Sequence, residues 1–317
     1  MSVALIVRAY NEEAHIGRLL TGVARQTEPP DDVLVVDSGS TDATRSIASA
    51  FGARIIPIAP EQFSFGRALN VGLTATDCSV AVFASAHVYP VYDTWLEHLV
   101  RPFDDQRVAL AYGRQQTPPE GRFAEQRVLD QWFPLVSQTR QPHPFCNNAN
   151  AAVRREIWER LPFDEDLTGL EDLDWAKRAQ DVGWSVSYVA EAPVVHVHNE
   201  PFAQVVNRYR REALAHKQIY DEQEMGALRA LTLATANIGG DLRAAMHARI
   251  PLRRAADIPV FRCAQFLGTY QGFAQHGPVT EVLRRRFYYP AAFPRSCDTD
   301  LSDEPIGTAI NYDSGRS

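Results

Sequence analysis

Residues 35–44 read VVDSGSTDAT, an apolar run that ends in a carboxylate and is followed by a turn and a helix start. We expect a strand over 32–36 and a helix over 41–51, with Ser40 or Thr41 as its cap. Asp37 then lies at the carboxyl end of a strand, where open α/β sheets bind ligands. The turn lacks the G-x-G-x-x-G spacing, which disfavours a dinucleotide site. Asp37 could accept hydrogen bonds from a ribose or a base, whereas a capped turn explains residues 38–42 alone.

The same alternation of strand and helix extends outward from this unit. Helical spacing predicts helices over 12–26 and 66–75, and short apolar runs predict strands over 3–7, 54–58 and 79–84. Strands separated by helices of about 10–15 residues indicate βαβ units. The sequence therefore predicts an α/β fold, with a mostly parallel central sheet flanked by helices.

The second half of the chain has a different pattern. A polar loop is expected to run from 145 directly into a helix at Arg154, and two strands are expected over 185–189 and 194–197. From Phe202 the pattern is helical, with breaks expected at Gly239–Gly240, Pro251 and Pro259. We therefore divide the chain into an α/β domain over 1–200, a C-terminal helical extension over 201–290 and a flexible tail over 291–317.

Composition and charge exclude some functions. The chain of 317 residues is 45% hydrophobic and 22% charged, and its net charge of −7 argues against nucleic-acid binding. Residues 201–290, however, carry 13 Arg and Lys against 7 Asp and Glu. Basic clusters at 208–211 and 284–286 suit contact with a lipid-diphosphate acceptor or an anionic membrane. A homodimer interface is the competing interpretation of these helices.

The cellular location is also constrained. The four cysteines fit no zinc or redox pair, and no run of 18 apolar residues is present to span a membrane. A strand begins almost at the N-terminus, so we expect no signal peptide. These features predict a cytoplasmic protein, at most peripheral to the inner face of the cell membrane.

Four stretches resemble family 2 glycosyltransferases of the GT-A fold. They are VRAYNEEAHIGRLL (7–20), VVDSGSTDAT (35–44), FSFGRALNVGL (63–73) and GLEDLDWAKRAQDVGW (169–184). Their order and spacing follow the family over 3–198, about two thirds of the chain. The resemblance implies a GT-A fold and transfer of a sugar from a nucleotide-sugar donor.

The resemblance also implies a donor site. The loop after the first strand and the end of the second hold the nucleotide in that family, and the helix at 66–75 closes over the base and phosphates. The matching residues here are Ala9, Asn11, Glu12, Asp37, Arg67 and Asn70. A guanidinium such as that of Arg67 can pair with phosphate oxygens. Simple helix capping by Asn11 and Glu12, and a surface position for Arg67, remain open.

Residues 83–90, FASAHVYP, depart from the family pattern. Relatives end this strand with Asp-x-Asp, whose second Asp binds Mg²⁺ or Mn²⁺, but here the two places hold Ser85 and His87. A later stretch, VVHVHNE (194–200), adds His196 and His198 on one face of a strand. Imidazole suits Mn²⁺ or Zn²⁺ better than Mg²⁺. A metal site of His87, His196 and His198, a cationic metal-free phosphate pocket, and histidines bonded to backbone carbonyls all remain open.

The resemblance assigns the chemistry to residues 169–178, GLEDLDWAKR. The family uses a Glu-Asp pair at the start of this helix, which makes Asp172 the base that deprotonates the acceptor hydroxyl and Glu171 its neighbour. Carboxylates at a helix start also have an electrostatic explanation. Amide side chains suit sugar hydroxyls, so Asn148 and Asn150 are candidate acceptor contacts, and Trp132 could stack on a sugar.

We therefore predict an inverting glycosyltransferase that acts on a polysaccharide or glycolipid acceptor, with a divalent cation, Mn²⁺ or Mg²⁺, as its candidate cofactor. Two alternatives remain open. The loss of Asp-x-Asp would fit a catalytically silent GT-A module that binds sugars or partners. It would also fit a metal-independent transferase that uses a nucleoside-monophosphate sugar.

Overall fold

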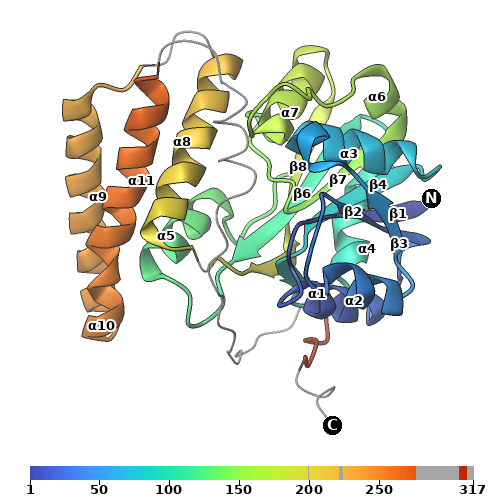
Figure 1. Cartoon of the computed structure of the whole chain (residues 1–317), viewed down its shortest axis with the longest axis horizontal. Helices are drawn as coiled ribbons and strands as arrows, with labels where there is room; N and C mark the ends of the chain where they lie inside the picture. The colour runs from blue at the N-terminus through green and yellow to red at the C-terminus, as the bar shows by residue number, and fades with distance from the viewer. Residues whose placement is uncertain (199, 221–223, 276–306, 313–317) are drawn as a thin grey trace.

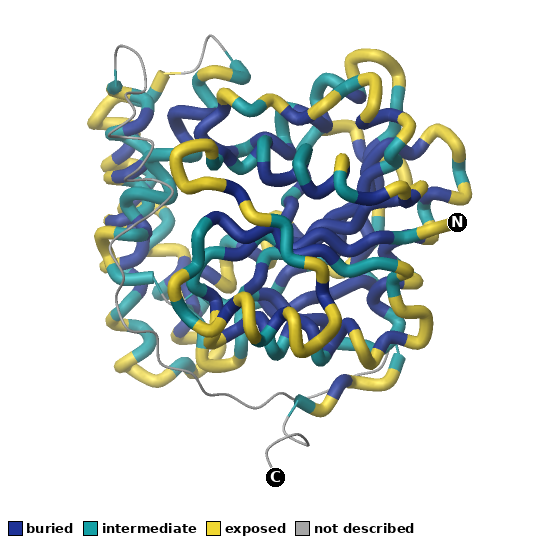
Figure 2. The backbone as a smooth tube through the Cα atoms, turned by 45° about the vertical axis from the view of Figure 1, so that its right-hand side comes forward, coloured by how far each residue is buried: buried dark blue, intermediate teal, exposed yellow. Residues whose placement is uncertain are grey.

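The structure is a computed structural model, and it describes residues 1–198, 200–220, 224–275 and 307–312. A twisted central sheet has helices on both faces, and a further layer of long helices stands beside it (Figure 1). The backbone is most deeply buried in the strands at the centre of the sheet (Figure 2).

In the described part of the chain the sheet has eight strands, in the order β3-β2-β1-β4-β7-β6-β8-β5. They are β1 (Val3–Ala9), β2 (Asp32–Asp37), β3 (Arg54–Pro57), β4 (Val80–Ser85), β5 (Val88–Pro90), β6 (Val108–Gln116), β7 (Asn150–Arg154) and β8 (Ser185–His196). Of these strands, only β7 and β5 are antiparallel to the strands with which they pair. The mostly parallel sheet predicted from the sequence is confirmed.

Two apolar layers attach the helices to the sheet. One face packs against α3 (Phe65–Thr74), α6 (Arg155–Arg160) and α7 (Glu171–Asp181), through Leu69, Trp158 and Trp175. The other face packs against α1 (Ile16–Ala24), α2 (Thr44–Ala50) and α4 (Trp95–Val100), through Leu19, Ala48 and Trp95. Short 3₁₀ turns at Pro60–Gln62 and Arg101–Asp104 complete these connections.

The register of the strands decides where polar residues meet. Ala9 pairs with Asp37, and Arg8 pairs with Ser85, so β1, β2 and β4 end together. Because β7 runs in the opposite direction, its first residue, Asn150, lies at the same edge of the sheet. The strand ends singled out in the sequence are therefore neighbours in space.

The helical layer consists of α8 (Phe202–Ile219), α9 (Ala227–His247), α10 (Leu252–Ala255) and α11 (Asp257–Phe273), and it packs on α5 (Phe123–Trp132) (Figure 1). Its own apolar cluster includes Phe123, Val205, Ile258 and Phe261. Among the described helices, none combines the length and apolar character that crossing a bilayer would require.

Two breaks expected in this layer are absent. Helix α9 continues through Gly239–Gly240, because buried contacts of Ala234 and Asp241 on either side hold it. Packing of this kind outweighs a glycine penalty of about 1 kcal/mol per residue. Pro259 lies in the first turn of α11, where a missing backbone N–H is harmless.

Strand β7 and the long β8 were not predicted correctly. The sequence before Arg154 was expected to be a loop, but Ala151, Ala152 and Val153 form a buried central strand because β4 and β6 flank them on both sides. The two strands expected within 185–197 form one strand, whose pairing with β6 shifts between Gly113 and Gln115.

The C-terminal prediction is corrected in part. Residues 307–312 pack on the body: Ala309 forms a β-bridge with Tyr92, and the Tyr312 hydroxyl donates to the carbonyl of Pro90 at 2.6 Å. The flexible tail predicted for 291–317 is therefore wrong for this segment. Residues 276–306, which include the basic cluster 284–286 and the predicted end of the helices, and residues 313–317 lie outside the described residues.

The side chain of Asn150 links a helix and two strands in the middle of the fold through hydrogen bonds. Its Oδ1 accepts from Trp95 Nε1 at 2.9 Å, and its Nδ2 donates to the carbonyls of Arg114 at 3.1 Å and Ala192 at 2.9 Å. A Cβ on Gly113 would lie 2.3 Å from this Nδ2, so only glycine lets the amide reach across. Asn150 is fully buried, and its predicted role as an acceptor contact is therefore wrong.

We expect Asn150→Ala to lower the free energy of unfolding by about 2–4 kcal/mol, because three buried groups would lose their partner. Urea unfolding measures this loss. Asn237→Ala is the matched control, since the Asn237 amide donates to the carbonyl of Leu233 within its own helix; we expect it to change stability by less than about 0.5 kcal/mol. Equal losses in both variants would show that the amide does not tie the strands together.

Candidate active site

A pair of carboxylates opens α7. Leu170 adopts a left-handed conformation with φ of 55°, which turns the chain sharply before Glu171 and Asp172 enter the helix. Both carboxylates are buried, with exposures of 4% and 7%. Buried charges need compensating partners, so their contacts define what the pair can do.

Each carboxylate has its own partners. Arg8, at the end of β1, forms an ion pair with Glu171, with 2.8 Å between Nη1 and Oε1. Asp172 accepts two backbone hydrogen bonds, from the N–H groups of Asn148 and Leu173, each at 2.8 Å. Glu171 is thus neutralised by a cation, whereas Asp172 is held only by neutral donors.

This difference shifts the pKa of Asp172. Burial raises the pKa and the adjacent Glu171 carboxylate raises it further, while the two backbone donors and Arg8 lower it, and the outcome is about 7. A carboxylate with a pKa near neutrality is suited to accept a proton from a substrate. Asp172 therefore has the properties of a general base.

The loop after β1 and the end of β2 form one connected surface. Asn11, in a left-handed conformation, accepts from the backbone N–H of Thr41 at 2.8 Å. Asp37 is 1% exposed and accepts from the N–H groups of Gly39 and Ser40 in its own turn. The Ala9 carbonyl accepts from the N–H of Ser38. Asp37 thus shapes the turn, so the capped-turn alternative also accounts for its position.

Helix α3 places Arg67 and Asn70 differently from expectation. Arg67 lies 3.3 Å from a carboxylate oxygen of Glu165 and is partly exposed, so it can still reach a ligand. Asn70 donates to the carbonyl of Phe163 and to Glu165, and its Oδ1 accepts from Trp158 Nε1 and the N–H of Phe163. All hydrogen-bonding positions of its amide are occupied within the protein, and the nucleotide contact predicted for Asn70 stays a prediction.

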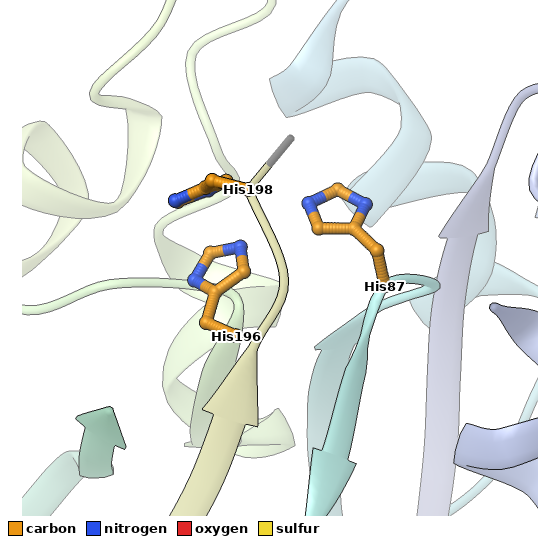
Figure 3. A group of neighbouring side chains, drawn as sticks. All are labelled: His87, His196 and His198. Atoms are coloured by element: carbon orange, nitrogen blue, oxygen red, sulfur yellow. The ribbon is translucent and has the colours of Figure 1, made fainter. Parts of the chain in front are cut away.

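Three imidazoles form the second part of the site. His87 comes from the turn between β4 and β5, His196 ends β8, and His198 follows it. One ring nitrogen from each lies within 4.8 Å of the others, and Figure 3 shows the rings of His87 and His196 facing each other with His198 beside them. The structure therefore gathers the three histidines singled out in the sequence.

Each ring contacts an oxygen through Nδ1. His87 Nδ1 lies 2.9 Å from Glu12 Oε1, and His196 Nδ1 lies 2.7 Å from Gln115 Oε1. His198 Nδ1 lies 2.9 Å from Glu125 Oε1, an ion-pair distance without the geometry of a hydrogen bond. A hydrogen-bonded oxygen at Nδ1, as in His87 and His196, favours a proton there and leaves Nε2 as a lone-pair donor. None of these partners is a backbone carbonyl, which disfavours the third alternative considered for the histidines.

His196 is the most deeply enclosed of the three. Burial holds its pKa well below the usual value, and His198 and His87 lower it further. Its Nε2 is buried and has no hydrogen-bond partner within the described residues. A neutral ring with an unused buried nitrogen fits a metal ligand better than a cationic phosphate contact.

The two parts of the site are joined through the sheet. Ser85 pairs in register with Arg8, and its N–H lies 3.4 Å from the carbonyl of Ala149. Asn148 lies beside the carboxylates, with its Nδ2 3.4 Å from Glu171 Oε1. Its own Oδ1 is buried without a partner among the described residues.

Trp132 lies in a more open position than the other residues predicted from the sequence. Its ring is 47% exposed and stacks on Phe145 with 4.5 Å between centroids. It remains accessible to a ligand, as expected for a stacking surface.

Several residues that contact the candidate site were missed. Arg8 lies within a recognised motif, so its position before Asn11 was an available signal. Gln115, Glu125 and Arg208 have no motif around them, and only the folded chain brings Gln115 and Glu125 to the histidines and Arg208 to Glu125.

Comparisons with known proteins identify the class. The chain matches the glycosyl transferase family 2 model over residues 4–161. It is 30% identical over 220 residues to the O-antigen chain rhamnosyltransferase WbaN of Salmonella anatum, covering 66% of this chain and 70% of the relative. It is 28% identical over 240 residues to the glycosyltransferase AglE of Haloferax volcanii, covering 73% and 78%. The protein is a glycosyltransferase. It belongs to glycosyl transferase family 2.

Solved structures show the same fold. The mannosyltransferase PcManGT of Pyrobaculum calidifontis, in complex with GDP-Man and Mn²⁺, has a TM-score of 0.58 at 19% identity and covers 92% of this chain and 88% of its own. Glucosyl-3-phosphoglycerate synthase of Mycobacterium tuberculosis, in complex with Mg²⁺ and UDP, has a TM-score of 0.54 at 22% identity and covers 71% and 81%. The expected GT-A fold is confirmed.

The raised pKa of Asp172 has a consequence for stability. The folded chain binds this proton more tightly than the unfolded chain, whose pKa stays near 3.8. Asp172 therefore reduces stability progressively as pH rises from about 4 to about 7. We expect Asp172→Asn to gain stability over the wild type by about 1–4 kcal/mol on going from about pH 5 to about pH 8.

Urea unfolding at the two pH values measures this difference. Asp181→Asn, at the exposed end of the same helix, is the control and should follow the wild type at both pH values. A constant offset between wild type and Asp172→Asn would mean that the carboxyl titrates normally.

Proposed function

We propose that the protein is an inverting transferase that moves a sugar from a nucleoside-diphosphate donor to a hydroxyl of a polysaccharide or glycolipid acceptor. The observation that carries this proposal is the buried pair at the start of α7, with Glu171 neutralised by Arg8 and Asp172 poised near neutral pKa. The relatives named as rhamnosyltransferases support the acceptor class.

The reaction needs one base on the acceptor side. Asp172 removes the proton of the acceptor hydroxyl as its oxygen bonds to the anomeric carbon of the donor sugar. The bond from that carbon to the diphosphate oxygen breaks, and the diphosphate leaves with the electron pair. Attack from the side opposite the leaving group inverts the anomeric centre. The backbone N–H of Asn148 holds the Asp172 carboxylate in this position.

The leaving diphosphate gains charge, and the histidines are suited to hold a cation that offsets it. We assign His87, His196 and His198 as ligands, with His87 and His196 binding through Nε2 because each of their Nδ1 atoms already contacts a side-chain oxygen. Three protein ligands leave further positions on a cation open for diphosphate oxygens. Imidazole ligands favour Mn²⁺ or Zn²⁺ over Mg²⁺, which prefers oxygen. A bound cation would stabilise the negative charge of the diphosphate.

The donor-side surface comprises the loop after β1, Asp37 and Arg67, as the family resemblance implies. We place the protein in the cytoplasm, where nucleotide sugars are made. The exposed Leu252 and Arg253 at the start of α10 suit peripheral contact with an anionic membrane that carries the acceptor. A second copy of the chain on the same helices is the alternative occupant, and a sizing measurement separates the two.

We expect Asp172→Asn to reduce turnover by about 10²–10⁴-fold while nucleotide binding persists, because the amide cannot take the proton. A panel of UDP-, GDP- and dTDP-linked sugars, rhamnose included, identifies the donor by its consumption, and a thermal shift reports nucleotide binding. Asp174→Asn is the matched control: it lies in the same helical turn but pairs with Arg178. Retained turnover in Asp172→Asn would remove this residue from the mechanism.

We expect EDTA to abolish donor turnover and Mn²⁺, Co²⁺ or Zn²⁺ to restore it better than Mg²⁺, since the ligands are nitrogens. His196→Ala should lose this restoration, whereas His143→Ala, which removes an exposed imidazole outside the cluster, should keep it. Undiminished turnover in EDTA would instead indicate a metal-free pocket or a nucleoside-monophosphate donor.

A further inference from the structure

The contact between His198 and the helical layer differs from the contacts of the other two histidines. Glu12 and Gln115, which lie at His87 and His196, belong to the loop after β1 and to β6 of the α/β domain. Glu125, which lies at His198, belongs to the first turn of α5, where the helical layer packs. The orientation of one imidazole thus depends on a part of the chain outside the central sheet.

Glu125 is deeply buried and shared between two partners. It is 3% exposed, and its Oε1 lies 2.9 Å from His198 Nδ1 and accepts from Arg208 Nη2 at 2.8 Å. Glu125 therefore lies between an imidazole and a guanidinium.

Arg208 extends this contact into α8. Its Nε lies 2.9 Å from Glu200 Oε2, and its guanidinium lies over the ring of Tyr209, 5.1 Å from the centroid. Glu200 belongs to the segment between His198 and α8. Arg208 thus holds both the carboxylate that faces His198 and the chain segment that follows it.

A carboxylate at Nδ1 has two effects on a metal-binding imidazole. It fixes the proton on Nδ1, so that Nε2 presents a lone pair, and it increases the basicity of the ring. One ring nitrogen from each histidine lies within 4.8 Å of the others. Ligands of a tetrahedral cation with bonds of about 2.0–2.1 Å lie about 3.4 Å apart, so these nitrogens need to shift by less than about 1 Å to close on a cation. Small displacements of His198 would therefore matter.

We propose that Glu125, held by Arg208, is a positioning residue that orients His198 toward the cation, so that the C-terminal helices complete the donor site. This inference rests on the cation site proposed above. It gives the helical layer a role in donor binding in addition to any contact with an acceptor or a membrane.

A second buried ion pair in the same layer offers a matched comparison. Asp241 of α9 accepts from Arg262 Nε at 2.7 Å, lies 3.5 Å from Arg127 Nε and is 3% exposed. It resembles Glu125 in burial and in its arginine partners. It is not among the residues that contact the three imidazoles in the described part of the chain.

The experiment measures cation affinity directly, without turnover. Untagged full-length protein is stripped with a chelator and titrated with Co²⁺, whose absorption reports nitrogen coordination, and with Zn²⁺ by calorimetry. Glu125→Ala should weaken binding by about 10–100-fold, with the isosteric Glu125→Gln between it and wild type. Asp241→Asn should bind like the wild type even where its thermal stability falls.

The outcomes separate this inference from the proposed function. Equal affinity in wild type, Glu125→Gln and Glu125→Ala would overturn the positioning role and leave the cation site intact. Equal weakening in Asp241→Asn and Glu125→Gln would also overturn it, because general loosening of the layer would then explain the loss. A wild type that binds neither Co²⁺ nor Zn²⁺ would remove the cation site itself, whereas loss of turnover in Asp172→Asn would still support the transferase.

Discussion

The site depends on strands that end together at one edge of a buried sheet. β1, β2 and β4 are parallel and in register, so Arg8, Asp37 and Ser85 reach that edge together. The reversed β7 starts at the same place and delivers Asn148 to the carboxylates. Backbone hydrogen bonds fix these positions to within a residue, because a slip by one residue would turn every side chain to the other face. Asn150 holds this arrangement together from within.

Charge at this edge is arranged in compensated groups. Arg8 neutralises Glu171, while Arg208 and His198 face Glu125. Asp172 is the exception, because it has backbone donors and a neighbouring carboxylate but no cation of its own. A residue that is costly to ionise in the folded state is the one that can take up a proton near neutral pH. The raised pKa of Asp172 and its cost to stability thus have the same physical origin.

The sequence motifs predicted the position of the site more accurately than they predicted which of its side chains are free to bind a ligand. Asp172 and the three histidines lie where their motifs indicated, and the GT-A fold followed from the same stretches. Asn70 and Asn150 also lie in the expected places, yet their amides are occupied by Phe163, Trp158, Trp95 and strand carbonyls. The sequence does not show whether the amide of an asparagine side chain is free or already hydrogen-bonded within the protein. Only the positions of distant partners decide its availability.

The sequence by itself determined the alternation of strands and helices, the carboxylate pair and the replacement of Asp-x-Asp by Ser85 and His87. Apolar periodicity and residue type are local, and they are readable without coordinates. Tertiary structure alone decided that β7 is a strand, that α9 continues through Gly239–Gly240, and that Glu125 reaches both His198 and Arg208. These outcomes depend on contacts between residues far apart in the chain, because burial between neighbouring elements outweighs local propensity.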